Sequence, residues 1–102
     1  MEINVNGIDE FKESIVDQTS VDYLKAHRRL HKIDNYGYVC KEHGNVIRRE
    51  KIVDELEEIM EFLYSDWFRA AVGVNPNRLL DILDKMFEEW KTEYDRKMKE
   101  GG

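Results

Sequence analysis

The residues best suited to chemistry in this chain are one cysteine and three histidines, all within residues 27–43. Two residues separate Cys40 from His43, a spacing at which a tight turn can direct two ligands to one metal ion. His27 and His31 are one helical turn apart, so they would share a face of a helix. If that helix packs against the turn, His27, His31, Cys40 and His43 close a zinc site of one thiolate and three imidazoles.

A plainer interpretation explains the same four residues without a metal. In a hairpin, Cys40 is a small buried strand residue and His43 is an exposed turn residue. His27 and His31 then belong to a solvated basic face of the preceding helix. Structural zinc sites usually contain two or more cysteines, and this chain has one. The plainer interpretation is the favoured prediction, and no cofactor is expected.

A second group of residues in the same region is basic. Residues 21–51 contain eight bases against four acids, although the net charge of the 102-residue chain is −6. A basic helix followed by a basic hairpin is an arrangement with which proteins dock on DNA, as a recognition helix and a wing. The residues that would bind nucleic-acid phosphate are Lys25, Arg28, Arg29, Lys32, Arg48 and Arg49.

The acidity of the whole chain opposes this nucleic-acid hypothesis, because a polyanion is repelled by net negative charge. Five acids and no base lie within residues 52–64. Ion pairing between those acids and the basic residues is therefore the favoured prediction.

Two further sets of residues are candidates for binding a protein partner or a second copy of the chain. One is an acidic stripe on a predicted helix, which would meet a basic partner unless it is simply the solvated face. The other is the end of an apolar stripe that the rest of the chain is too short to cover. The acidic stripe comprises Asp54, Glu57, Glu58 and Glu61, and the uncovered apolar end comprises Trp90, Tyr94 and Met98.

Motifs that would indicate catalysis are absent from the sequence. It contains no glycine-rich phosphate loop, no H-E-x-x-H pair and no nucleophile elbow. No run approaches the roughly 18 apolar residues that a membrane span requires, and the acidic N-terminus does not resemble a signal peptide. We therefore expect a cytoplasmic protein that is neither an enzyme nor bound to a membrane.

The elements that must position these residues are mainly helical. Hydrophobic periodicity predicts two shorter N-terminal helices, the second of which would begin at Thr19 or Ser20. A small two-stranded β-hairpin is predicted at about 36–49, followed by helices at about 50–72 and 76–99. Within the first of these, Ser65-Asp66 could alternatively cap a separate short helix. The short GVNP link would make these two a long antiparallel helical hairpin. The fold class is therefore α with one small β-hairpin, in a single domain spanning residues 1–102.

Composition and motifs together favour a small acidic interaction or regulatory protein that binds, and in doing so inhibits or modulates, another macromolecule. Its size, its acidity and its lack of catalytic motifs are typical of small accessory proteins of bacteriophages or bacteria. The alternative is a small DNA- or RNA-binding regulator that uses residues 25–51. If the zinc site forms, the metal would hold the helix and the hairpin of this region together.

Overall fold

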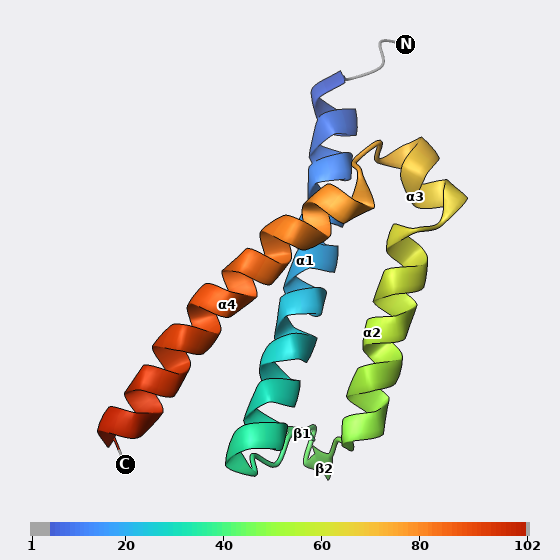
Figure 1. The fold of residues 1–102 in the computed structure, drawn as a ribbon. Helices are drawn as coiled ribbons and strands as arrows, with labels where there is room; N and C mark the ends of the chain where they lie inside the picture. The colour runs from blue at the N-terminus through green and yellow to red at the C-terminus, as the bar shows by residue number, and fades with distance from the viewer. Residues whose placement is uncertain (1–4, 102) are drawn as a thin grey trace.

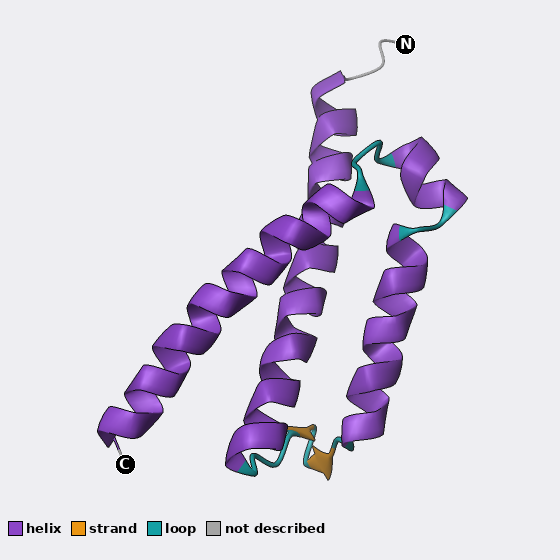
Figure 2. Cartoon of the chain, viewed as in Figure 1, coloured by secondary structure: helices purple, strands orange, loops and turns teal. Residues whose placement is uncertain are grey.

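The computed structural model describes residues 5–101, with side chains from residue 10 onward, and it confirms a mainly helical chain with one small hairpin. The molecule is elongated, with principal dimensions of 59 × 28 × 23 Å. Its elements follow in the order α1 (Val5–Tyr36), β1 (Lys41–Glu42), β2 (Asn45–Val46), α2 (Arg49–Leu63), α3 (Asp66–Ala71) and α4 (Pro76–Gly101), which Figure 1 labels. Figure 2 shows that helices make up most of the chain.

The N-terminal part is one helix, so the prediction of two shorter helices is wrong. Helix α1 has 32 residues, a length of about 48 Å at 1.5 Å per residue. Thr19 and Ser20 lie within it, and their hydroxyls donate to the carbonyl oxygens of Ile15 (2.8 Å) and Val16 (2.6 Å). A hydroxyl that bonds back to the preceding turn is satisfied inside a helix, so it does not start a new one.

The β-hairpin is shorter than predicted, with strands of two residues each. Lys41 pairs with Val46 and Glu42 with Asn45, which leaves His43 and Gly44 as the turn. Both turn residues have positive φ, 52° and 80°. A two-residue turn of this kind matches the twist of paired strands, and glycine adopts it readily.

The single helix predicted over 50–72 is two helices, and the alternative start at Ser65-Asp66 is the one that the chain uses. Tyr64 ends α2, and Ser65 then has extended backbone and begins α3. The Ser65 side chain accepts a hydrogen bond of 3.1 Å from the Phe68 backbone N–H. An N-cap that satisfies a free backbone donor stabilises a new helix start. Asn75 and Pro76 begin α4 in the same way, since Asn75 Oδ1 accepts from the Asn77 N–H at 2.9 Å.

Helix α1 is the centre of the fold. Helices α2 and α4 each pack on α1, and they diverge from one another toward the hairpin end (Figure 1). Helix α2 runs antiparallel to α1, and α4 runs in the same direction as α1. The predicted pair of helices packed along each other is therefore replaced by two helices that pack on a third. Their shared core includes Tyr23, Leu24, Leu63, Phe68, Val72, Leu79, Leu80 and Leu83.

A second, smaller core lies beneath the hairpin. Cys40 and Ile47 from the hairpin pack with Ala26 of α1 and Ile52 of α2. The Ile47 N–H donates to the Cys40 carbonyl at 2.8 Å and extends the hairpin ladder. A two-stranded hairpin is marginal by itself, so these buried side chains hold it against the two helices.

Candidate functional site

The four predicted metal ligands are not brought together. Cys40 is 3% exposed in the core beneath the hairpin, whereas His43 is exposed at the turn. His27 and His31 face α4, with ring centroids 5.4 and 6.1 Å from Phe87, so the prediction that they lie on a solvated face is also wrong. Among the described residues, no group of three or more His, Cys, Asp or Glu side chains is arranged to hold a metal ion. The four residues therefore do not form one ligand set in this structure, because helix packing turns His27 and His31 away from the hairpin.

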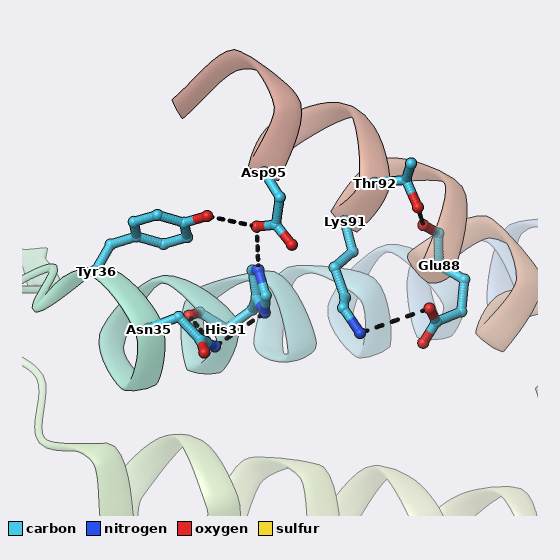
Figure 3. A network of polar contacts seen from close by, with 7 residues as sticks. All are labelled: His31, Asn35, Tyr36, Glu88, Lys91, Thr92 and Asp95. Carbon is cyan, nitrogen blue, oxygen red and sulfur yellow. Dashed lines mark hydrogen bonds and ion pairs between the residues drawn. The ribbon is translucent and has the colours of Figure 1, made fainter. Parts of the chain in front are cut away.

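His31 belongs to a polar network between α1 and α4 (Figure 3). Its Nε2 atom lies 2.7 Å from Oδ1 of Asp95, and Asn35 Nδ2 lies 3.1 Å from its Nδ1 atom. A carboxylate accepts and an amide nitrogen donates, so these contacts fit a histidine with its proton on Nε2. The hydroxyl of Tyr36 donates to the same carboxylate oxygen at 2.7 Å.

The network changes the acidity of its members. The hydrogen bonds from His31 and Tyr36 lower the pKa of Asp95, because they stabilise its ionised form. The same bond raises the pKa of Tyr36 to about 12, since loss of its proton would place two negative charges together. His27, one turn earlier, has a lowered pKa because burial disfavours its charged form. The network is a structural link, and it offers no nucleophile or open ligand position.

Sequence reasoning missed this network, although a signal was present. Asp84 and Asp95 are 11 positions apart, which is about three helical turns, and thus share one edge of α4. Tyr23 donates to Asp84 at 2.6 Å just as Tyr36 donates to Asp95. Acids repeated at a helical period beside an apolar stripe indicate polar contacts with a packed neighbour.

The predicted aromatic binding surface is largely used within the molecule. Trp90 and Tyr94 stack on each other at 4.9 Å, and both are half-buried against α1. Lys32 Nζ lies 5.9 and 5.4 Å from their ring centroids, within the range of a cation–π contact. Met98, by contrast, is 42% exposed. Of the three predicted contact residues, only Met98 has the exposure that the prediction requires.

The acidic stripe is exposed along its whole length. Asp54, Glu57, Glu58 and Glu61 lie on the face of α2 opposite its buried residues Ile52 and Leu63. Among the residues from 10 to 101, none of these four carboxylates forms an ion pair. The predicted pairing of these acids with the basic residues is therefore wrong.

Four of the six predicted phosphate-binding residues lie together on α1. A hollow of about 380 Å³ is lined by Lys25, Arg28, Arg29 and Lys32, with no carboxylate in its lining. The Arg28 guanidinium lies 5.4 Å from the Trp90 ring centroid, and its Nε atom is shielded from solvent without a hydrogen-bond partner in the described part of the chain. These cations, of which Arg28, Arg29 and Lys32 are half-buried, form a local positive surface on an acidic molecule.

The other two predicted phosphate-binding residues are separated from this hollow. Arg49 is held by Asp34 through two bonds of 2.8 and 3.1 Å, which lower the pKa of Asp34. Arg48 precedes α2 and faces a shallow hollow beside the hairpin with His43 and Lys51. Helix and hairpin therefore do not present one continuous basic surface.

No helix in the described range is long and apolar enough to cross a membrane. Comparisons with protein-family models, with curated proteins and with solved structures find no match to this chain.

Proposed function

We propose that this chain is a non-enzymatic interaction protein that binds a basic surface of another macromolecule through the acidic stripe of α2. The observation that carries the proposal is the exposure of all four carboxylates without any ion pair in the described chain. Carboxylates at i, i+3, i+4 and i+7 form one row about 10 Å long, since each residue advances a helix by 1.5 Å. Such a row complements a row of Lys or Arg side chains on a partner.

A partner surface of this kind would itself be suited to nucleic-acid phosphate, so binding to this chain would block it. This is the sense in which the protein would inhibit or modulate its partner. Trp90 and Tyr94 contribute indirectly, because they hold α4 on α1. The exposed Met98 adds at most a minor apolar contact at the far end of α4.

The proposal is tested with the variant Glu57→Lys/Glu61→Lys. Immobilised wild-type and variant protein are exposed to one cell extract at equal salt, and each retained protein is purified and titrated by calorimetry. We expect a basic protein that binds the wild type and not the variant. The proposal fails if every purified binder has equal affinity for both. Circular dichroism of the variant serves as the control for folding.

A second candidate function, nucleic-acid binding, is favoured by one specific observation, the hollow without carboxylates around the unpartnered Nε of Arg28. Labelled duplex DNA and single-stranded RNA are the probes, and Arg28→Gln/Lys32→Gln is the variant. Binding that falls with rising salt and is lost in this variant supports the second candidate, because phosphate contacts release counterions. Equal titration curves for wild type and variant eliminate it.

A further inference from the structure

The groove between α1 and α2 has both of its bases on the α1 side and two acids facing them from α2. Lys25 and Arg29 line it from α1 together with the acid Asp22, Glu55 and Glu58 line it from α2, and Glu42 of β1 lines its hairpin end. Its volume is about 470 Å³. No residue of α4 is part of its lining, so this groove opens on the side of α1 away from α4. The apolar part of the lining comes from Ala26, Ile59 and Phe62.

The two charged rows do not neutralise each other within one chain. In the part of the molecule that is described, no ion pair joins Lys25 or Arg29 to Glu55 or Glu58. The charges of each row are therefore free to pair with another molecule, and apolar side chains lie between the two rows. An occupant that fits this face must present a negative row, a positive row and an apolar strip between them.

The geometry points to a second copy of this chain as that occupant. Helices α1 and α2 run antiparallel on the two sides of the groove (Figure 1). A twofold axis parallel to the groove places α1 of one copy against α2 of the other. Such a rotation does not change the height of a residue along the axis. Within one chain, Lys25 and Arg29 lie along the same stretch of the groove as Glu55 and Glu58. In the dimer, the two bases of one copy therefore face Glu55 and Glu58 of the other copy.

The charges select this axis over its alternative. A twofold axis across the groove would place α1 on α1 and α2 on α2, so that like charges face each other, which is unfavourable at an interface. The selected axis gives four helices in which each runs antiparallel to its neighbours, as in a four-helix bundle. The apolar residues of both grooves then meet on the axis.

Exposed aromatic residues extend the same face beyond the groove. Trp67 is 52% exposed, and its ring centroid lies 5.7 Å from that of Phe62. Phe11 is 57% exposed and lies 18 positions before Arg29, which is five turns of 3.6 residues along the same side of α1. Burial of such side chains between two copies supplies an apolar contribution that charge pairs alone lack.

The dimer goes beyond the proposed function, since Lys25, Arg29 and Glu55 lie outside the acidic stripe and Glu58 is the one residue that belongs to both. It is tested by reversing one row at a time, with Lys25→Glu/Arg29→Glu in one protein and Glu55→Lys/Glu58→Lys in another. We expect the wild type to be dimeric and each variant to lose about a hundredfold or more in dimer affinity. An equimolar mixture of the two variants should form a heterodimer, because every reversed row then meets its opposite.

Native mass spectrometry identifies the heterodimer by its intermediate mass, and analytical ultracentrifugation measures the affinities. The matched control is Glu57→Lys/Glu61→Lys, which makes the same charge change on α2 outside the groove and should keep the dimer. The same control variant tests the acidic stripe in the proposed function. It should lose partner binding and keep the dimer, so the two proposals can fail independently of each other. Circular dichroism and thermal melts establish that each reversed protein is folded.

Salt provides an independent test. Attraction between the rows is screened by added salt, so dimer affinity should fall as ionic strength rises. Repulsion between two chains of net charge −6 would give the opposite trend. The inference is overturned if the wild type stays monomeric at millimolar concentration, if row reversal leaves a dimer unchanged, or if the mixed variants do not associate.

Discussion

The Nε2 atom of His31 lies 2.7 Å from Oδ1 of Asp95, a contact between residues 64 positions apart that fastens the far half of α4 to α1. Beyond Leu83, the contacts of α4 with α1 are made by aromatic rings, by the hydrogen bond from Tyr23 to Asp84 and by this polar network, since the buried residues of α4 all lie in its first half. Asp95 therefore adds a polar link to the aromatic contacts that hold the C-terminal half of α4 on α1.

Replacing Asp95 with Asn should lower the melting temperature by a few degrees and release the end of α4. The neutral amide cannot accept charge-assisted bonds from both His31 and Tyr36. Hydrogen exchange measured by mass spectrometry should show faster exchange after Trp90. The matched control is Glu93→Gln, which removes an exposed pair within α4 and should leave exchange unchanged. Equal exchange in the two variants would contradict the role of the network.

The stability of the wild type should fall as the pH is lowered from 7.5 to 5.5. The pKa of His27 is lowered in the folded state, so the unfolded chain binds more protons between the folded and unfolded pKa values. Stability therefore rises with pH in that window and is lost below the unfolded value of about 6.5. His27→Phe keeps a ring between Tyr23 and Phe87 and should flatten the dependence of melting temperature on pH. A variant as sensitive to pH as the wild type would refute this assignment.

Replacing Ser65 with Ala should reduce the free energy of unfolding by about 1 kcal/mol, the usual cost of losing an N-cap. The cap separates α2 from α3, and its bond to the Phe68 N–H lies next to the fully buried Phe68 ring. Urea denaturation measures the difference. Ser14→Ala on the exposed face of α1 is the control and should not lower the free energy of unfolding, because alanine is the better helix former. Equal midpoints for the two variants would contradict the capping role.

Replacing Gly44 with Ala should destabilise the hairpin by about 1 kcal/mol, because a side chain disfavours the φ of 80° at this turn position. Open space surrounds the added methyl group, so backbone strain is the whole effect. His43→Gly should be stabilising, since its φ of 52° is easier for glycine. Thermal unfolding followed by circular dichroism would show shifts of opposite sign. A loss of stability in His43→Gly would indicate that the His43 side chain has a role beyond the turn.

The breaks between elements could be read from neighbouring residues, and the packing between elements could not. Gly44 at the hairpin turn, Ser65 before α3 and Asn75-Pro76 before α4 are local signals, and the structure uses each of them. Thr19 and Ser20 were misleading because a hydroxyl satisfies a helix start and a helix interior equally well. The exposure of the acidic stripe also followed from periodicity alone.

The sequence by itself determined a helical protein with one small hairpin, since helical periodicity, caps and turns depend on residues within a few positions of each other. Tertiary structure alone decided that α1 is the centre, that His31 faces Asp95 rather than Cys40, and that the basic and acidic rows flank one groove. The physical reason is that apolar burial has no direction, so a stripe of Leu, Phe and Trp side chains specifies that a helix packs but not against which partner. Only the folded arrangement of distant segments selects those contacts.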